Sequence, residues 1–381
     1  MRADKKLRIL IVFGTRPEAI KLAPVVREAA QRPWAQPIVC VTAQHREMLD
    51  QMLEVFGIKP EIDLSIMTHK QSLPAITAKI LTRLSKVIVE TRPRLVVTQG
   101  DTTTTFAASL AAFYEKVPVA HVEAGLRTWK KDEPFPEESN RKLADALADF
   151  HFAATEGNRE NLLTEGADPE KIFVVGNTVV DALRHILRAN RGRAPFDGLP
   201  AIDRRKKLIV VTAHRRESFG EPLRNICEAL KRIVDINSDV EIVYPVHLNP
   251  NVLLPVRELV GGNKRIHLLP PLDYCAFVEL LRRTYLILTD SGGVQEEAPS
   301  LKKPVIVMRD VTERPEGVDA GFVRVVGTGV GAIVDAAQEL LGDSSVHERL
   351  KRIPNPYGDG HSASRILSII GRHRASLLSR H

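Results

Sequence analysis

Short apolar runs alternate with amphipathic helical stretches along most of the chain. The runs have the length and continuity of strands buried in a parallel sheet, and the stretches between them repeat apolar residues at helical spacing. The runs cover 7–13, 37–42, 95–98, 117–122 and 172–175, and then 208–212, 241–246, 286–289 and 305–308. Such alternation is typical of parallel sheets covered by helices, so the pattern predicts an α/β fold.

The chain of 381 residues is too long for one small core and favours two domains. A basic stretch with Gly and Pro, 188–207, separates the two series of apolar runs and is interpreted as a linker. We assign 1–177 to a first domain and 178–358 to a second, and we expect a last helix within 359–381.

Composition narrows the class of protein. The chain is 44% hydrophobic and 27% charged, which is ordinary for a globular protein, and its net charge is +7. It contains no long Lys/Arg block and few aromatic residues, which argues against nucleic-acid binding. We find no signal-peptide pattern and no apolar run of membrane-spanning length, and the three cysteines form no CxxC motif. These features favour a cytoplasmic protein that does not bind a membrane.

A glycine-containing turn in the second half is the most informative local pattern. Ser291, Gly292 and Gly293 lie between an apolar strand and a helix, where glycines allow a ligand to approach the backbone and the helix start favours an anion. Glu297 lies about one turn further on and can accept ribose hydroxyls, and Arg314 can pair with phosphate. Taken alone, the turn is also compatible with an ordinary strand–helix connection.

Acidic side chains follow successive strands of the first half. Asp101 and Glu123 stand at strand ends, and Glu137 opens a helix. Asp101 has a structural alternative as a capping or turn residue, and the pair of Glu137 and Glu138 has one in electrostatic capping of the helix dipole. Because carboxyl ends of parallel strands meet at one edge of a sheet, three such acids favour a catalytic site for proton transfer.

Basic and apolar residues supply further candidates. Arg16 and Lys21 flank the first helix start and are candidate phosphate contacts, and His214 follows a strand beside two arginines. Leu272 and Phe277 lie in a turn and helix where they can hold a nucleobase.

Ordered motifs along nearly the whole chain resemble those of the non-hydrolysing UDP-N-acetylglucosamine 2-epimerases. They read GTRPEAIKLAP, VTAQHREMLDQ, GDTTTT, HVEAGLRT, PEESNR, GNTVVDAL, TAHRRESFG, YPVHLNPN, SGGVQEEAPS and NPYGDG. The resemblance implies two Rossmann-like domains facing across a cleft, as in B-type glycosyltransferases, with a C-terminal helix crossing back to the first domain.

The resemblance also implies roles for the candidates. Asp101, Glu123, Glu137 and His214 match catalytic positions, while UDP is expected on the second domain. The residues matching substrate-binding positions are Arg16, Lys21, Leu272, Phe277, Ser291, Gly292, Gly293, Glu297 and Arg314. The implied reaction is reversible inversion at C2 to UDP-N-acetylmannosamine, a precursor of bacterial cell-surface polysaccharide, with no cofactor and no metal. It proceeds by elimination of UDP to a 2-acetamidoglucal and re-addition, which needs a base on one face of C2 and an acid on the other.

The family further implies a homodimer and, in bacterial members, a second UDP-N-acetylglucosamine bound as an allosteric activator. Gln44, Arg215 and His247 match positions of that activator site. Glu47 and Lys70 stand where some members have Gln and Arg, so activation is left open. The alternatives are a hydrolysing epimerase that releases N-acetylmannosamine and UDP, a glycosyltransferase of the same fold, and a nucleotide-sugar sensor without turnover.

Overall fold

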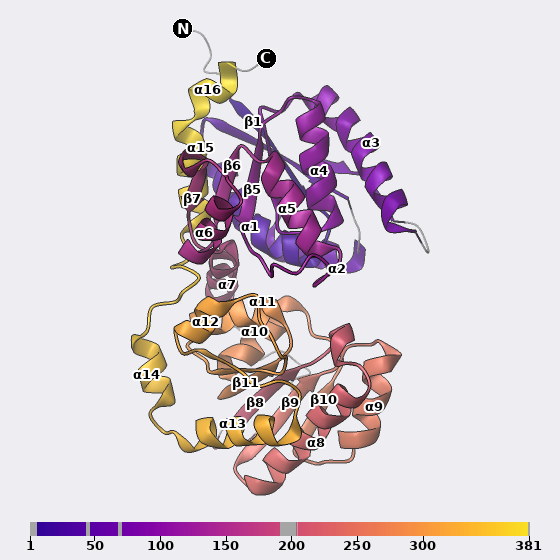
Figure 1. Ribbon diagram of the computed structural model, residues 1–381, viewed down its shortest axis with the longest axis vertical. Coiled ribbons are helices and arrows are strands. Elements are labelled where there is room, and N and C mark those ends of the chain that lie inside the picture. The colour runs from indigo at the N-terminus through magenta and orange to yellow at the C-terminus, as the bar shows by residue number, and fades with distance from the viewer. Residues whose placement is uncertain (1–5, 43–45, 68–70, 191–202, 204, 380–381) are drawn as a thin grey trace. The chain divides into compact units, whose positions relative to one another are not determined.

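The computed structural model describes residues 6–42, 46–67, 71–190, 203 and 205–379 (Figure 1). The chain divides into two compact units. Unit 1 comprises residues 1–182 together with 357–381, and unit 2 comprises residues 183–356. Unit 1 is therefore built from two separate parts of the sequence.

Unit 1 contains a parallel sheet of seven strands in the order β3-β2-β1-β4-β5-β6-β7. The strands are β1 (Leu7–Phe13), β2 (Ala35–Val41), β3 (Ile62–Asp63), β4 (Leu95–Gln99), β5 (Val119–Ala124), β6 (Phe150–Ala153) and β7 (Ile172–Val174). The order reverses between β1 and β4, and in open α/β sheets ligands bind beyond the strand ends at such a reversal.

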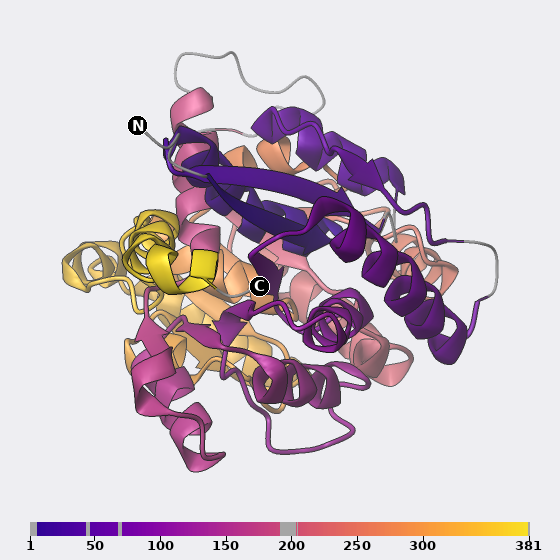
Figure 2. The same ribbon diagram turned by 90° about the horizontal axis from the view of Figure 1, so that it is seen from above.

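Helices cover both faces of this sheet, as Figure 2 shows. They are α1 (Arg16–Gln31), α2 (Arg46–Phe56), α3 (Leu73–Thr91), α4 (Thr103–Tyr114), α5 (Glu137–Leu147), α6 (Glu156–Thr164), α7 (Thr178–Ala189), α15 (Ser362–Arg372) and α16 (Arg374–Ser379). The division between the units falls within α7. Side chains of β1 and β4, such as Leu10, Val12 and Val96, pack with α3 and α4 into one buried apolar cluster.

Unit 2 contains a parallel sheet of six strands in the order β10-β9-β8-β11-β12-β13. The strands are β8 (Lys207–Thr212), β9 (Val240–Pro245), β10 (Ile266–Leu269), β11 (Leu286–Thr289), β12 (Val305–Val307) and β13 (Val323–Val325). The helices are α8 (Glu221–Ile236), α9 (Pro250–Val260), α10 (Tyr274–Arg283), α11 (Gly292–Glu297), α12 (Pro315–Asp319), α13 (Val330–Gly342) and α14 (Val346–Arg352). Successive residues of β8 enter different apolar clusters, because a strand presents alternate side chains to opposite faces of its sheet.

The predicted α/β class, with two parallel sheets and a C-terminal helix returning to the first unit, is confirmed. Helix α15 contacts α1, and α16 contacts β1. The N-terminal cap of α15 is supported from α7, since Asp181 accepts hydrogen bonds from the Ser362 and Ala363 N–H groups at 3.2 and 2.9 Å. Among the helices that the structure describes, none is long and apolar enough to cross a membrane.

Candidate functional site

Asp101 follows β4 and is held by two residues of α5. Its Oδ2 accepts a hydrogen bond from Arg141 Nη2 at 2.6 Å, and its main-chain oxygen accepts one from Asn140 Nδ2 at 3.0 Å. The next residue, Thr102, caps α4, since its hydroxyl accepts a hydrogen bond from Thr105 N. The carboxylate is therefore fixed by a cation while its main chain is tied to a neighbouring helix.

Glu123 lies at the end of β5 in an unusual backbone conformation. Its φ is 65°, and the register between β5 and β6 shifts between Val122 and Ala124. A non-glycine residue with positive φ is strained, and such strain concentrates at functional sites. The carboxylate forms an ion pair with Lys21 of α1 and accepts a hydrogen bond from Asn177 Nδ2 at 3.2 Å. The irregular strand end aims Glu123 at groups from two other elements.

The two adjacent acids at the start of α5 have different environments. Glu138 is fully buried and accepts hydrogen bonds from the Thr128 and Trp129 N–H groups and from Arg141, so it organises the preceding loop. Glu137 is the first residue of the helix and is partly buried. Glu138 thus has the structural role that the capping interpretation had offered for the pair.

Glu18 connects the loops after β1 and β4 and was not identified from the sequence. It is 2% exposed, and its Oε2 accepts from Gly14 N, Thr15 N and Thr15 Oγ1, while its Oε1 accepts from the hydroxyls of Thr102 and Thr105. Burial raises its pKa, although these hydrogen bonds oppose the shift. Glu18 ties the loop after β1 to the loop that carries Asp101. The capping-box spacing of Thr15 and Glu18 was the available signal.

Gly14 allows the ends of β1, β2 and α4 to approach one another. A Cβ at this position would lie 1.9 Å from Thr42 Oγ1 and 2.8 Å from Thr104 Oγ1, distances that real Cβ atoms do not show. Arg16 follows at the start of α1 and forms no ion pair with any residue that the structure describes. Its guanidinium is available to an anion.

In unit 2, the glycine-containing turn packs against the guanidinium of Arg314. Gly292 is buried at the start of α11, and a Cβ there would lie 2.5–2.9 Å from the guanidinium atoms of Arg314. Arg314 is oriented by Glu296, which accepts from its Nε at 2.7 Å, and by Glu313. The helix begins at Gly292, so the glycines belong to its first turn and not to the loop before it. Ser291 is its N-terminal cap residue.

Glu297 is 6% exposed and accepts a hydrogen bond from the Tyr274 hydroxyl at 2.9 Å. Tyr274, the first residue of α10, was not singled out from the sequence. Leu272 and Phe277, on either side of it, are partly buried and pack against the apolar cluster of unit 2. The predicted base-binding pair and the predicted ribose-binding acid thus belong to adjoining elements of one unit.

His214 stacks directly on His247. The two rings are 5.5 Å apart between centroids and nearly parallel, at 6°. Asp290, fully buried at the end of β11, accepts from His214 N at 2.7 Å and Arg215 N at 2.8 Å and so fixes this loop. The candidates assigned to catalysis and to activator binding are therefore in contact. Gln44 and Lys70 lie outside the described residues, as does the side chain of Glu47.

Arg215 lies among other charged groups. Burial, and after it the charge of Arg309, lowers its pKa, and it forms no ion pair within the described part of the chain. Arg309, in contrast, is paired with Glu217 and Glu313. A partly buried guanidinium beside other arginines favours an anionic ligand.

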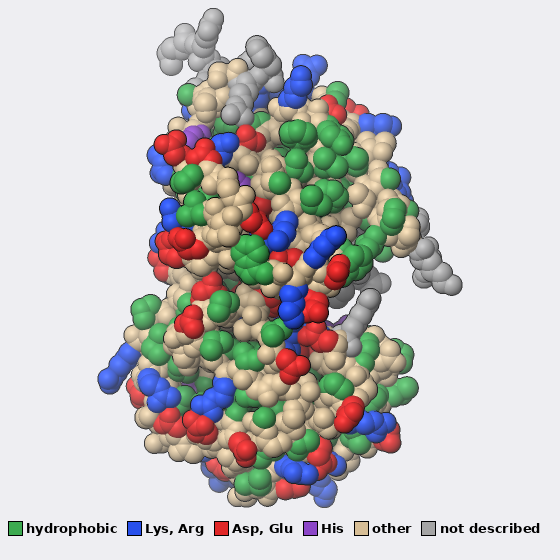
Figure 3. All heavy atoms as spheres, viewed as in Figure 1, with side chains coloured by type: hydrophobic (Ala, Val, Ile, Leu, Met, Phe, Trp, Pro, Cys, Tyr) green, Lys and Arg blue, Asp and Glu red, His purple; other side chains and the backbone are tan. Residues whose placement is uncertain are grey.

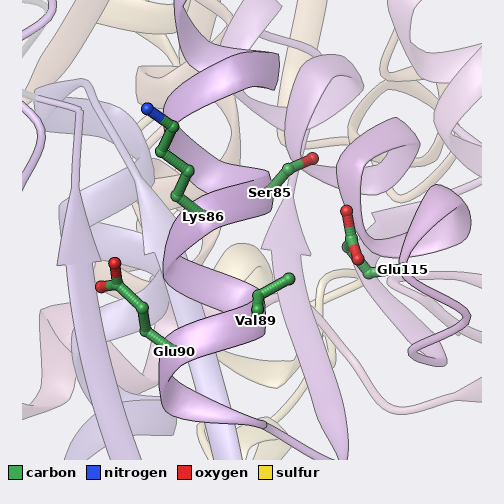
Figure 4. A pocket seen from close by; sticks show the side chains of 5 residues that line it. All are labelled: Ser85, Lys86, Val89, Glu90 and Glu115. Carbon is green, nitrogen blue, oxygen red and sulfur yellow. The ribbon is translucent and has the colours of Figure 1, made fainter.

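A hollow elsewhere in unit 1 does not join these groups. Figure 4 shows it between the last turns of α3 and the residue after α4; it is lined by Ser85, Lys86, Val89, Glu90 and Glu115. Helices connecting parallel strands run back toward the opposite edge of the sheet, so the hollow lies away from Asp101 and Glu123. Among the described residues, no group of three or more His, Cys, Asp or Glu is arranged to hold a metal.

Comparison with known proteins gives a consistent result. A family model described as UDP-N-acetylglucosamine 2-epimerase matches residues 27–371. A protein of that name from Escherichia coli K12 is 52% identical over 376 residues, covering 97% of this chain and 100% of its own. One from Bacillus subtilis 168 is 49% identical over 363 residues, covering 95% and 94%. A crystal structure of the Neisseria meningitidis UDP-GlcNAc 2-epimerase bound to UDP-GlcNAc superposes with a TM-score of 0.92 at 45% identity, covering 96% of this chain and 100% of that one.

Proposed function

Because the chain belongs to the UDP-N-acetylglucosamine 2-epimerase family, we propose that it inverts C2 of UDP-N-acetylglucosamine reversibly, without hydrolysis. The product is UDP-N-acetylmannosamine, a precursor of bacterial cell-surface polysaccharide. The observation that carries the proposal is the set of held carboxylates, Asp101 and Glu123, at neighbouring strand ends of unit 1.

The chemistry requires that C2 lose a proton although that proton is only weakly acidic. Elimination solves this: the C1–O bond to UDP breaks, a base takes the C2 proton, and the electron pair of the C–H bond forms a C1=C2 double bond. In the return step an acid delivers a proton to the opposite face of C2, and a diphosphate oxygen of UDP attacks C1. The balance of atoms needs no oxidant or reductant.

Three acids are assigned to proton transfer at C2. Asp101 is paired with Arg141, and Glu123 with Lys21, so each carboxylate is held in place by a cation beside it. Glu137, at the start of α5, is favoured as an anion by the helix dipole. His214 serves as an acid or helps to neutralise the diphosphate.

UDP is assigned to unit 2. The Gly292 turn and Arg314 suit the diphosphate, since a bulkier residue at 292 would displace the guanidinium. Glu297, oriented by Tyr274, suits the ribose hydroxyls, and Leu272 and Phe277 suit the uracil. Arg16 and Lys21 are also assigned to the phosphates of the substrate, and Ser291 and Gly293 complete the turn.

A second UDP-N-acetylglucosamine is proposed as an activator near Arg215 and His247, with Gln44 as a further contact. The support is the stacking of His247 on the catalytic candidate His214, which gives an occupant of one position direct contact with the other. Addition of substrate analogue should then raise turnover at low substrate, and substitution of Arg215 by Gln should abolish that activation.

A homodimer is proposed through the outer face of α4 and its neighbours. Helix α4 is apolar on most sides, and Phe113 and Tyr114 at its end are 57% and 60% exposed. Val89 of α3 and Leu143 of α5 are also exposed, and Figure 3 shows apolar side chains gathered over α4. Contiguous exposed apolar surface of this kind marks a protein–protein contact.

The test is proton NMR of UDP-N-acetylglucosamine incubated with the protein in D2O. Deuterium at C2 together with signals of UDP-N-acetylmannosamine is expected. Free N-acetylmannosamine and UDP would instead establish the hydrolysing reaction. An unchanged substrate, with binding measured separately by calorimetry, would refute turnover and leave a sensor or transferase.

Substitution separates the three acids. Asp101→Asn, Glu123→Gln and Glu137→Gln are each expected to reduce turnover by about 100-fold or more, the usual size of a general acid–base contribution, while UDP still binds. Near-normal turnover in all three variants would remove the proposed mechanism.

A further inference from the structure

A buried histidine connects the two loops that carry Asp101 and Glu123. His121, in β5, is fully buried; its Nδ1 lies 2.6 Å from Asp145 Oδ1, and its Nε2 lies 2.7 Å from the main-chain oxygen of Gly100. The Gly100 N–H in turn donates to the Val122 oxygen at 3.0 Å. Gly100, the residue before Asp101, is therefore bonded to β5 through both its N–H and its carbonyl group.

Both ring nitrogens of His121 face groups that only accept hydrogen bonds. A carboxylate and a main-chain carbonyl have no proton to donate, so both contacts can form only if both nitrogens carry a proton. Burial alone would lower the pKa of His121, but the charge of Asp145 and the hydrogen bonds to Asp145 and Gly100 outweigh it, and the pKa is raised. Asp145, despite its own burial, has a pKa held below the usual range, chiefly by His121.

Other charged side chains surround the pair of His121 and Asp145. Arg127 donates to Asp145 Oδ2 at 2.7 Å and forms hydrogen bonds through its Nε to both oxygens of Glu165. His151, on β6, lies with Nδ1 3.6 Å from Asp145 Oδ1. His121 and Arg127 thus share the buried anion Asp145, while the partly exposed Glu165 pairs with Arg127 and, at 3.3 Å, with Lys142. The imidazolium therefore has a compensating carboxylate beside it.

We propose that His121 is a positioning residue, which as a buried imidazolium between Asp145 and the Gly100 carbonyl fixes the Asp101 carboxylate relative to Glu123. This role rests on the proposed epimerase function. Loss of the Nε2 hydrogen bond frees the Gly100 peptide, and a displacement of about 1 Å at a reacting group costs roughly 100-fold in rate. A polar neutral side chain at 121 should therefore lower kcat more than it changes KM.

The protonation state is measured by NMR on the full chain labelled with ¹⁵N-histidine. At about pH 8.5, two units above the ordinary histidine pKa of about 6.5, one imidazole should still show protons on both nitrogens. Contacts from its ring protons to the Gly100 and Asp101 amides assign it without any variant. A neutral ring with these contacts would overturn the proposal.

The kinetic test compares His121→Gln with His151→Gln. The two histidines are paired in register on adjacent strands, are both buried and approach the same Asp145, but only His121 bonds to Gly100. We expect His121→Gln to lose about 100-fold in kcat with UDP affinity unchanged, and His151→Gln to stay within about threefold. Equal losses in both variants, or full activity in His121→Gln, would overturn the proposal.

The two proposals fail differently. A wild-type protein that exchanges no proton at C2 refutes the epimerase function. The backbone amide shifts of Gly100 and Asp101 then decide the positioning role: movement in His121→Gln and not in His151→Gln supports it, and unmoved shifts in both refute it.

Discussion

The ion pair between Lys21 and Glu123 allows stability and catalysis to be separated. The two side chains are 10% and 9% exposed, so removal of either one leaves a buried charge without its partner. Breaking a buried pair from one side costs roughly 3–5 kcal/mol, whereas replacing both partners is often close to neutral. Lys21→Met should therefore destabilise unit 1 by about 3 kcal/mol, which for a unit of this size lowers Tm by roughly 6–12 °C.

The double variant Lys21→Met/Glu123→Gln should regain most of that loss. No buried carboxylate then lacks a cation, and the amide oxygen introduced at position 123 can still accept from Asn177. Turnover should not return, because neither the cation nor the carboxylate remains. Differential scanning calorimetry measures the stability of each variant, and deuterium exchange at C2 measures its turnover.

The control is an exposed pair, Lys130 and Glu133, whose side chains are 60% and 67% exposed. Lys130→Met should change the free energy of unfolding by less than about 1 kcal/mol, since exposed pairs contribute little. The reasoning about Lys21 is refuted if the double variant is less stable than Lys21→Met, or if the two single losses simply add.

Three further predictions concern unit 2 and the surface. Gly292→Ala should weaken UDP binding in calorimetry by about tenfold or more. The added Cβ would displace the Arg314 guanidinium, and one charge-assisted contact contributes roughly 1.5–3 kcal/mol. Unchanged affinity would refute the placement of the diphosphate beside Gly292 and Arg314. Burial alone would raise the pKa of Glu313, but the charges of Arg314 and Arg309 and the hydrogen bond from Arg309 outweigh it and lower that pKa to about 2. The ionised Glu313 carboxylate thus stabilises the folded protein by roughly 3 kcal/mol above about pH 4.5, and this contribution is lost as pH falls toward 2. In urea unfolding, Glu313→Gln should not show this loss of stability at low pH. Phe113→Lys, alone or with Tyr114→Lys, should convert the dimer to a monomer in light scattering, and a wild-type monomer would remove that proposal.

The fold was predictable because the periodicity of the sequence matches its burial. Continuous apolar runs became parallel strands: the runs 7–13 and 208–212, for example, lie in β1 and β8. The residues at which helices end were less predictable. Helix α5 begins at Glu137, as the sequence predicts, but it ends at Leu147 and Phe150 already lies in β6. Helical spacing alone did not separate the helix end from a strand that begins only three residues later.

The site was partly predictable for a related reason. Strand ends identified Asp101 and Glu123, since the edge where ligands bind follows from topology. Their partners came from elsewhere in the chain: Arg141 lies 40 residues after Asp101, and Asn177 lies 54 residues after Glu123. Such pairings depend on tertiary packing, which one sequence does not encode locally. Glu18 was missed because its partners Thr102 and Thr105 lie 84 and 87 residues further along the chain.

Unit 1 is completed by residues that follow unit 2 in the chain. Its sheet and first helices come from residues up to 182, but α15 and α16, which contact α1 and β1, are separated from them by the whole of unit 2. Domains generally fold as units during synthesis, from the N-terminus onward. Here unit 2 can finish folding on the ribosome before α1 and β1 make their contacts with α15 and α16. The Tyr357 oxygen then accepts from the Asn177 N–H at 2.8 Å, and Asn177 also contacts Glu123. The surroundings of this carboxylate are thus completed only after unit 2 has been synthesised, so a nascent chain that ends within unit 2 does not yet hold the full set of contacts that orient it.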